Sequence, residues 1–598
     1  MFKLIRRLFS LLTKKQRKQY YALQLLVVLM AVMEIAGVAS IIPFMALVGN
    51  MSQLKQDTLI AQVYQASGIS SETQFLFLLG FAVLIMLLIA TLISSYTIWT
   101  ISMFSNKIGA EIADRLYTHY LKQGWLFHAS GSSALLTKKI AIESIRVTSG
   151  ILLPLMHVNA KTILAFLMIL SIFIYDPTVA IIIFTIFAVA YTILFTVVRM
   201  RLQRNGKTIS AVNEQRFRLM NEGFGGIKDV LLLGRDSDFI KRFNQTGVSL
   251  ARSLGTNDAL GAMPRYIMEL IAFGSMIAVV LYLIAYYEAN LGIILPILSV
   301  YALAGVKLLP AFQSIYTSIA RIKANSAAFE SIQGDLDNSQ QTKSSILKID
   351  KTTLLPKKHI SLENVTFKYP NKEDTALNQL NMSIPVNSVI GIVGPSGSGK
   401  STLVDILLGL IQPQSGQLKI DDDVINNKNR RPWQNTIGFV AQSIFLSEGS
   451  IAENVAFGIP QDQINFDQVY RALKLAHLDE LIDSYQDGIH TKVGERGVQL
   501  SGGQRQRIGI ARALYYKAEV LVFDEATSSL DGITEKMIME AIHNFSGQKT
   551  IIMIAHRLKT VQKCDQIFFI DKGKVVDKGT YEELIENNEH FKNMAANA

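Results

Sequence analysis

Long apolar runs separated by polar segments dominate the first 330 residues. Each run is long enough to cross a hydrocarbon layer of about 30 Å, which requires roughly 20 residues in a helix. The runs lie near residues 21–48, 75–104, 147–174, 177–200, 262–287 and 291–319. The pattern therefore predicts a membrane domain of six transmembrane helices within residues 21–330.

The connections between these runs alternate in charge. Residues 105–146 and 199–261 are long and rich in Lys and Arg, whereas residues 49–74, 175–176 and 288–290 contain a single basic residue, Lys55. Basic loops stay on the cytoplasmic side of a membrane. The pattern therefore predicts a multi-pass protein of the cytoplasmic (inner) membrane with both termini in the cytoplasm.

The first 20 residues are amphipathic. Phe2, Ile5, Leu8, Phe9 and Leu12 recur at helical spacing among basic side chains, as in a helix that lies in the membrane interface. A cleavable signal peptide is the alternative, but the apolar run from Tyr21 to Val48 is too long for its hydrophobic region. We therefore expect an interfacial helix over residues 1–20.

The pattern changes after the sixth run. Residues 331–358 are polar and poor in aromatic side chains, as in a linker. A strand-like alternation of polar and apolar residues then begins at His359, in the stretch ISLENVTFKY. The sequence thus predicts a linker over 331–358 and a second domain over 359–598.

Composition agrees with this division. The chain of 598 residues is 49% hydrophobic with a formal charge of +11, and residues 1–330 hold 30 basic against 16 acidic residues. Because the basic excess lies in the membrane half, a nucleic-acid-binding protein is disfavoured. The single cysteine, Cys564, excludes an intrachain disulfide and is interpreted as a small residue beside a strand.

The second domain contains a phosphate-binding loop. Apolar Val389–Val393 predicts a buried strand, and the following residues fit the pattern G-x-x-x-x-G-K-[ST] before a helix. Backbone N–H groups of such a loop hold phosphates, the lysine reaches the β- and γ-phosphates, and the serine hydroxyl binds Mg²⁺. A Ser/Gly linker is disfavoured because strand, loop and helix follow in order. The predicted nucleotide-binding residues are Gly394, Pro395, Ser396, Gly397, Ser398, Gly399, Lys400, Ser401 and Thr402.

Two further predicted strands end in residues suited to phosphate chemistry. Val520–Phe523 leads into Asp524 and Glu525, and the strand TIIMI leads into His556. Ligands bind at the carboxyl ends of strands in open α/β sheets. We expect Asp524 to hold Mg²⁺, Glu525 to polarise the attacking water, and His556 to donate a hydrogen bond to the γ-phosphate; a structural role is the alternative for His556.

A second helix N-terminus suited to anions follows the segment LSGGQ. Ser501, Gly502, Gly503 and Gln504 precede the helical stretch RQRIGIARALYY, and exposed N–H groups at a helix start bind anions. One nucleotide does not require two such cradles from one chain.

The motifs GPSGSGKST, LSGGQ, VLVFDEATSSLD and IIMIAHRL together resemble those of ABC transporter ATPases. The resemblance implies an α/β ATPase domain with an antiparallel β subdomain and a helical subdomain, using ATP and Mg²⁺. It implies that two chains bind head to tail, each ATP lying between the phosphate loop of one and LSGGQ of the other. It further implies that Tyr369 stacks on adenine, Gln442 contacts Mg²⁺ and Asp531 communicates between the sites.

Six predicted spans followed by an ATPase on one chain resemble a type I ABC exporter half-transporter. Ionisable residues within apolar runs are costly and usually functional. Glu34, Arg265 and Lys307 are the candidates for substrate contact, and Arg265 and Glu269 are spaced to pair on one helix face. Pairing between helices, or snorkelling of the long side chains, is the structural alternative.

The membrane half also resembles bacterial lipid-linked oligosaccharide flippases, through MEIAGVASIIPFMAL, AMPRYIMELIAF and KLLP. This resemblance implies a homodimer that flips a polyprenyl-pyrophosphate-linked glycan, with Arg265 and Lys307 at two of the family's basic positions and a short external helix within residues 52–66. Other basic positions of that family in runs two and six have no equivalent here, and a plain loop is the alternative to the external helix. The rival functions are an exporter of lipids or amphipathic drugs, a peptide exporter and an ATP-gated channel.

Overall fold

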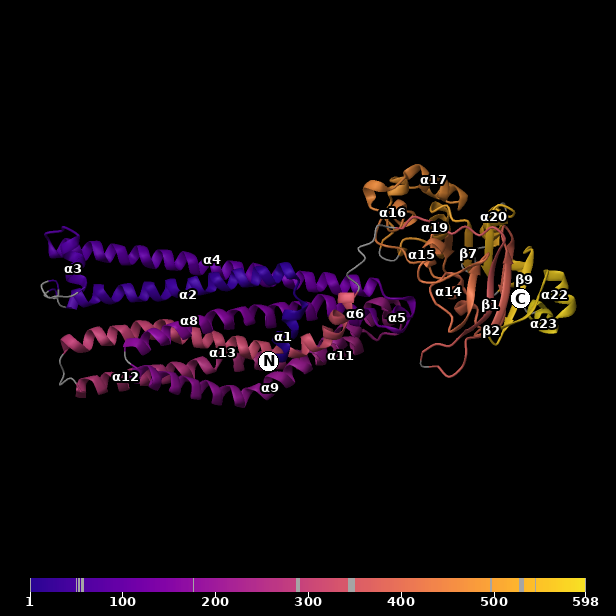
Figure 1. Cartoon of the computed structure of the whole chain (residues 1–598). Coiled ribbons are helices and arrows are strands. Elements are labelled where there is room, and N and C mark those ends of the chain that lie inside the picture. The colour runs from indigo at the N-terminus through magenta and orange to yellow at the C-terminus, as the bar shows by residue number, and fades with distance from the viewer. Residues whose placement is uncertain are drawn as a thin grey trace. The chain divides into compact units, whose positions relative to one another are not determined.

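The computed structural model divides the chain into two compact units (Figure 1). One comprises Met1–Gln123 with Phe127–Ser345, and the other Gly124–Leu126 with Ile346–Ala598. The structure describes residues 2–49, 51, 54, 59–175, 177–286, 291–341, 350–370, 372–494, 497–525, 532–543, 545–555 and 557–596.

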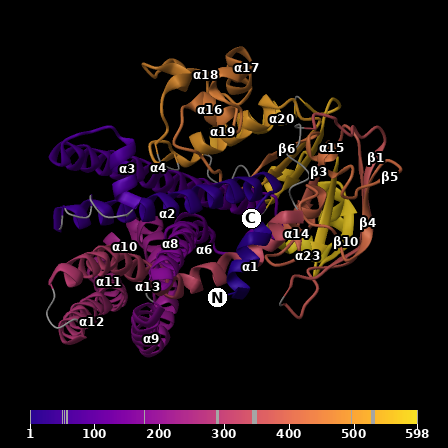
Figure 2. The same cartoon turned by 60° about the vertical axis from the view of Figure 1, so that its left-hand side comes forward.

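The first unit is built from long helices. Helices α2 and α4 run side by side in both views (Figure 1 and Figure 2). The helical elements up to residue 341 are α1 (Phe2–Leu11), α2 (Lys14–Gly49), α3 (Leu59–Ala66), α4 (Glu72–Leu121), α5 (Trp125–Ser130), α6 (Ser133–Lys138), η2 (Lys139–Glu143), α7 (Ser144–Val147), η3 (Thr148–Leu152), α8 (Leu153–Tyr175), α9 (Pro177–Gly225), α10 (Ile227–Leu232), α11 (Asp236–Ala262), α12 (Pro264–Tyr286) and α13 (Leu291–Gln341).

Four helical segments are long and apolar enough to span a membrane, among the described residues. They are Lys14–Val48, Glu72–Leu121, Ser133–Ile174 and Phe184–Gly225. Helices α12 and α13 cover the fifth and sixth predicted runs. The prediction of membrane-spanning helices is therefore confirmed for four runs, and the count of six stays a prediction.

Two predicted boundary segments differ in the structure. Helix α13 continues to Gln341, so the first part of the predicted linker is helical; Ile332 and Leu336, one turn apart, are both buried there. The N-terminal segment ends its first helix at Leu11, and the Thr13 hydroxyl accepts a hydrogen bond from the Gln16 N–H at 3.2 Å to start α2. The polar composition of residues 331–341 predicted a linker, but a few buried apolar residues are enough to hold a polar helix in place.

A helix covers part of residues 52–66, the segment predicted to form an external helix. Helix α3 begins at Leu59, and the Tyr64 and Phe75 rings lie edge to face with centroids 5.0 Å apart. Most of residues 52–58 lie outside the described part of the chain.

Helices α9 and α13 approach closely at a glycine. A Cβ atom at Gly206 would lie 2.0 Å from the carbonyl oxygen of Ala324. Because such a contact is impossible, only glycine permits this backbone packing.

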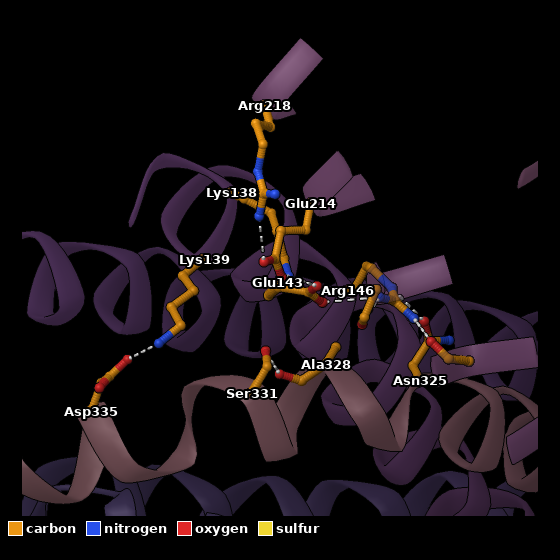
Figure 3. Close-up of polar contacts among 12 residues, drawn as sticks. Lys138, Lys139, Glu143, Arg146, Glu214, Arg218, Asn325, Ala328, Ser331 and Asp335 are labelled. Carbon is orange, nitrogen blue, oxygen red and sulfur yellow. Dashed lines mark hydrogen bonds and ion pairs between the residues drawn. The ribbon is translucent and has the colours of Figure 1, made fainter. Parts of the chain in front are cut away.

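A buried ion cluster connects η2 and its neighbours to α9. Lys138 Nζ lies 3.5 Å from Glu143 Oε1 and 3.3 Å from Glu214 Oε2, and Arg146 Nη1 lies 2.9 Å from Glu143 Oε2 (Figure 3). Arg146 Nε also donates to Asn325 Oδ1 on α13 at 3.2 Å. We call Lys138, Glu143, Arg146 and Glu214 the Glu143 cluster. The cluster and its hydrogen bond to Asn325 connect the α6–α7 segment with α9 and α13, shortly before the apolar helix α8 begins.

The second unit contains two sheets. One is antiparallel in the order β2-β1-β4-β5, and the other has the order β10-β9-β3-β8-β7-β6 with parallel β9, β3, β8, β7 and β6. Val389–Val393 of β3 is buried throughout, as its apolar run predicts. The strands are β1 (His359–Phe367), β2 (Leu377–Pro385), β3 (Val389–Val393), β4 (Ser415–Ile420), β5 (Asp423–Val424), β6 (Ile437–Val440), β7 (Val520–Asp524), β8 (Thr550–Ile554), β9 (Gln566–Asp571) and β10 (Lys574–Gly579).

Helices accompany both sheets and form a separate helical group between β6 and β7. These helices are α14 (Lys400–Leu407), α15 (Arg430–Gln434), α16 (Ile451–Val455), η5 (Gln461–Gln463), α17 (Phe466–Leu475), α18 (Asp479–Asp483), η6 (Gly488–His490), α19 (Gly502–Tyr515), α20 (Gly532–His543), α21 (Leu558–Val561), α22 (Tyr581–Asn587) and α23 (Glu589–Ala596). The antiparallel sheet, the parallel sheet and the helical group are the three parts that the sequence predicts for this domain.

Candidate functional site

The sheet register aligns three strand ends at one edge. Ile392 of β3 pairs with Ile554 of β8, and Ile554 pairs with Asp524 of β7. Because β8 lies between β3 and β7, the phosphate loop and Asp524 lie at the same edge of the sheet. This is the edge where α/β sheets bind ligands.

The loop after β3 is shaped by glycine. Gly394, Gly397 and Gly399 have φ values of 156°, 79° and 105°, and a Cβ atom at Gly394 would lie 2.0 Å from the carbonyl oxygen of Ile570. The buried hydroxyl oxygen of Ser398 has no hydrogen-bond partner among the described residues. A loop with open backbone and an unpaired polar group suits a phosphate ligand.

Lys400 begins helix α14 and folds back over the loop. Its ammonium donates to the carbonyl oxygens of Gly394 at 2.8 Å and Pro395 at 2.9 Å. Burial lowers the pKa of Lys400, while the nearby carboxylates of Glu525 and Asp524 oppose that shift. The cation is therefore held at the loop, near Asp524, the predicted Mg²⁺ ligand, and Glu525, the predicted catalytic residue.

Tyr369 reaches the same helix from the segment after β1. Its hydroxyl lies 3.1 Å from Thr402 Oγ1, and its ring packs edge to face on Phe367 with centroids 5.0 Å apart. The structure thus brings Tyr369 to the first turn of α14, next to the phosphate loop.

Glu525 follows β7 in a conformation that non-glycine residues seldom adopt. Its φ is 49°, and its N–H donates to the carbonyl oxygen of Ile554 at 3.0 Å. The side-chain amide of Gln442 donates to Glu525 Oε2 at 2.7 Å. Strained backbone of this kind often occurs at functional sites, and here it accompanies two residues that the sequence assigns to one site.

The LSGGQ segment starts helix α19. Ser501 Oγ accepts from the Gln504 N–H at 3.2 Å, and Gln504 Oε1 accepts from the Ser501 N–H at 2.8 Å. This reciprocal capping fixes the helix start, and Gly502 and Gly503 occupy its first two positions. The predicted second anion cradle is thus an ordered helix N-terminus.

The predicted Mg²⁺ ligands come from three elements. Ser401 lies in the first turn of α14, Asp524 at the end of β7, and Gln442 after β6. No cluster of three or more His, Cys, Asp or Glu side chains that could hold a metal occurs in the described ranges. The arrangement fits Mg²⁺, which proteins bind with one or two side chains plus phosphate and water oxygens.

Two predicted site residues, His556 and Asp531, lie outside the described residues. Cys564 is buried beside β9, and burial raises the pKa of its thiol to about 12. A structural role for this cysteine agrees with the sequence interpretation.

Two of the three predicted membrane residues form an ion pair. Lys307 Nζ on α13 lies 3.3 Å from Glu34 Oε2 on α2, and the Ser94 hydroxyl on α4 donates to Glu34 Oε1 at 3.0 Å. The Glu34 side chain is 9% exposed, whereas that of Lys307 is 42% exposed. Sequence reasoning missed Ser94; the pair of serines at 94 and 95 within an apolar run is the signal that could have identified it.

Arg265 is held separately on α12. Its Nε donates to Glu269 Oε1 at 2.7 Å, and its side chain is 62% exposed. The predicted i, i+4 pair is confirmed, whereas Arg265 makes no hydrogen bond or ion pair with Glu34 or Lys307 in the described part of the chain.

An apolar cavity of about 330 Å³ lies among α8, α9, α12 and α13. Val306 and Leu308, the two neighbours of Lys307, are among its lining residues, with Phe187, Phe273 and Phe312. The Glu34–Lys307 ion pair and the apolar cavity thus involve adjacent residues of helix α13.

Comparison with known families supports both halves of the chain. The family model described as "ABC transporter transmembrane region" matches residues 23–303, and that described as "ABC transporter" matches residues 377–528.

Relatives and a solved structure extend the match over most of the chain. An ATP-dependent lipid A-core flippase of Pectobacterium atrosepticum is 28% identical over 83% of this chain and 84% of the relative. The flippase of the same name from Alkalilimnicola ehrlichii is 31% identical over 67% of each chain. A bacterial Atm1-family ABC exporter with ATP bound matches 97% of this chain and 98% of its own with a TM-score of 0.78 and 20% identity, which supports the fold.

Proposed function

The chain belongs to the ABC transporter family as an exporter-type half-transporter that couples ATP hydrolysis to translocation, and we propose that it flips an anionic glycolipid. The favoured substrate is a polyprenyl-pyrophosphate-linked oligosaccharide moving from the cytoplasmic to the outer leaflet of the inner membrane. The N- and C-termini then lie in the cytoplasm.

We assign the ATP chemistry to residues at the aligned strand ends. Lys400 and the loop N–H groups would bind the β- and γ-phosphates, and Ser401, Asp524 and the side-chain carbonyl oxygen of Gln442 would bind Mg²⁺. Glu525 accepts the proton of the attacking water, and Gln442 orients its carboxylate through their 2.7 Å hydrogen bond.

Three further residues complete the proposed ATP site. Tyr369 stacks on the adenine. His556 donates a hydrogen bond to the γ-phosphate, and Asp531 links the two sites.

The proposed active form is a homodimer. Each chain offers two anion cradles, the phosphate loop before α14 and the capped start of α19. In a head-to-tail dimer the phosphate loop of one chain and the Ser501–Gln504 segment of the other enclose each ATP. ATP binding closes the pair and switches access to the membrane cavity, and hydrolysis resets it.

The observation that carries the substrate proposal is the Glu34–Lys307 pair. A charged residue within an apolar span is costly unless it is paired or functional. Lys307 is paired with the Glu34 carboxylate, and 42% of its side chain is still exposed and accessible to a ligand. Such an ammonium can contact a pyrophosphate oxygen without first losing its partner.

A second candidate substrate is a lipid A-core-type glycolipid, another lipid or an amphipathic drug. Relatives named ATP-dependent lipid A-core flippase favour the first of these. The apolar cavity beside Lys307 suits the hydrocarbon part of any of these molecules. Stimulation of ATP hydrolysis and flipping in liposomes separates the candidates, with the polyprenyl-pyrophosphate glycan and lipid A-core compared at equal concentration.

Replacing Lys307 by Met is expected to reduce flipping of the pyrophosphate glycolipid about tenfold or more, because the charge-assisted contact is lost. Lys307→Arg, which keeps the cation, should retain most of it. Lys241→Met, an exposed position on α11, is the matched control for charge. Flipping is measured by leaflet accessibility of a labelled lipid in liposomes, and equal rates in Lys307→Met and Lys241→Met would remove Lys307 from the substrate site.

Replacing Arg265 by Ala is expected to impair flipping by about tenfold if its guanidinium binds the head group. Glu269→Gln tests the alternative, because it removes the 2.7 Å ion-pair partner but keeps the cation. We expect Glu269→Gln to retain flipping. Equal losses in both variants would assign the pair a structural role in α12.

A further inference from the structure

A second cavity lies in the first unit, away from the Glu34–Lys307 pair. It has a volume of about 370 Å³ and is lined by residues of α1, α9 and α13. Lys323 in its lining is 16 residues beyond Lys307 on α13, which corresponds to about 24 Å along a helix. This α1–α9–α13 cavity is therefore separate from the proposed transport site.

The cavity has a cationic middle. Arg199 of α9, Lys323 of α13 and Arg7 of α1 contribute three positive charges, against the single carboxylate of Glu330. Arg7 Nη1 donates to Gln333 Oε1 at 2.8 Å and so ties α1 to α13. Neither Arg199 nor Lys323 forms an ion pair with any residue that the structure describes. The cavity thus keeps two cations available for an anion.

The lining changes from apolar to polar along the helices. Phe195, Arg199 and Gln203 are spaced four residues apart on one face of α9. On α13 the lining begins with Ile319 and Ile322 and continues past Lys323 to Ser326, Glu330 and Gln333, with the ring of Phe329 among these polar residues. Each wall therefore begins with apolar groups, continues to a cation, and then presents hydrogen-bonding groups, beside which Phe329 adds one apolar ring on α13.

This gradient coincides with the end of the apolar spans. Arg199 is the first charged residue after residues 177–198, and Arg321 and Lys323 are the first charged residues after Lys307. The amphipathic helix α1 contributes Arg7 at the same cavity. A cavity with apolar groups toward the span and cations at its end matches a lipid, whose phosphate lies just outside the hydrocarbon layer.

We propose that the α1–α9–α13 cavity binds a phosphate-bearing lipid of the cytoplasmic leaflet. Arg199 and Lys323 hold the phosphate, and Arg7 closes the site from α1. Phe195, Ile319 and Ile322 contact the first carbons of the lipid chain. Gln203 and Gln333 hydrogen-bond groups beyond the phosphate, on the cytoplasmic side.

The test measures lipid binding to the full-length protein by native mass spectrometry, with dioleoyl phosphatidic acid as the probe. In Arg199→Gln/Lys323→Gln, phosphatidic acid binding should weaken about tenfold or more. Arg201→Gln/Arg321→Gln is the matched control, because it removes the same charge from exposed positions of the same two helices outside the cavity lining. Binding by this control should stay within about twofold of the original protein.

Several outcomes overturn the proposal. Equal weakening of phosphatidic acid binding in both double variants would show that general surface charge, not this cavity, determines binding. Unchanged binding in Arg199→Gln/Lys323→Gln would show that the cavity does not bind the lipid phosphate. Competition by inorganic phosphate at equal affinity would assign it to a soluble anion. The single variants Arg199→Gln and Lys323→Gln are measured as well. The melting temperature of each protein shows whether a loss of binding comes from misfolding.

The source of the lipid follows from a second probe. Tighter binding of undecaprenyl phosphate than of phosphatidic acid would support a loading site for a polyprenyl substrate. Equal binding would support a site for bulk phospholipid. Both outcomes retain the proposed site, and neither depends on the transport assay that tests the proposed function.

Discussion

Glu525→Gln is expected to lower ATP turnover by roughly 10²- to 10⁴-fold while ATP binding is retained. The carboxylate follows β7 at the edge shared with the phosphate loop, and the Gln442 amide holds it at 2.7 Å. A glutamine side chain has nearly the same shape and can accept that hydrogen bond, but it cannot take a proton from water. Phosphate release measures the loss of turnover, and equilibrium nucleotide binding on the same preparation measures whether ATP binding is retained.

The matched control for this change is Glu519→Gln. Glu519 precedes β7, has a side chain 47% exposed, and forms an ion pair with Lys549 at 3.2 Å at the opposite end of the strand. A pair with a solvent-exposed carboxylate contributes little, and Glu519 lies away from the phosphate loop, so turnover should stay close to that of the original protein. Glu525→Gln with a rate within tenfold of this control would exclude Glu525 as the general base.

Local motifs predicted the ATP site well because its chemistry is held in short segments. The phosphate loop follows directly from a buried strand, so GPSGSGKST defines both its position and its shape. The pairing of Glu525 with Gln442 joins residues 83 positions apart. The position of Glu525 at a strand end predicted its place in the site, whereas Gln442 was assigned to the site only through resemblance, because no spacing rule connects the two segments.

The membrane half was predictable in its spans and less so in its contacts. Hydrophobicity located the runs, because lipid selects long apolar helices whatever their neighbours. The pairing of Glu34 with Lys307 depends on how α2 and α13 pack, which hydropathy does not encode. The predicted start of the linker at residue 331 differs from the structure for a related reason. Ile332 and Leu336 become buried only when α13 packs against other helices.

The Glu143 cluster was not predicted at all. Its residues come from the two long polar connections, 105–146 and 199–261. The sequence gives no sign that Glu143 becomes fully buried, with a side-chain exposure of 0%. Two π-helical turns, η2 and η3, flank α7 there. Such turns arise from packing rather than from local propensity.

Glu143→Gln is expected to destabilise the protein by about 3 to 5 kcal/mol, the usual loss when one partner of a buried ion pair is removed. Lys138 and Arg146 would keep their charges while losing a carboxylate 3.5 and 2.9 Å away. The Lys138 side chain is 4% exposed, so water cannot replace that partner. The midpoint of urea unfolding and the apparent melting temperature measure the loss.

The control is Asp238→Asn, which breaks an ion pair of similar length. Arg235 and Asp238 lie 3.1 Å apart with side chains 66% and 58% exposed. We expect this change to cost less than about 1 kcal/mol, because water solvates both groups. A loss in Glu143→Gln no larger than in Asp238→Asn would show that the buried cluster does not stabilise the fold.

A double replacement separates the cost of an unpaired charge from the value of the pair. In Glu143→Met/Arg146→Met both buried charges of the 2.9 Å contact are removed, and Glu214 still lies 3.3 Å from Lys138. Apolar replacement of a buried pair is often close to neutral, so this variant should recover much of the stability lost in Glu143→Gln. If it is instead the less stable of the two, Arg146 stabilises the fold chiefly through its hydrogen bonds to Ser210 and Asn325, which connect this segment to α9 and α13.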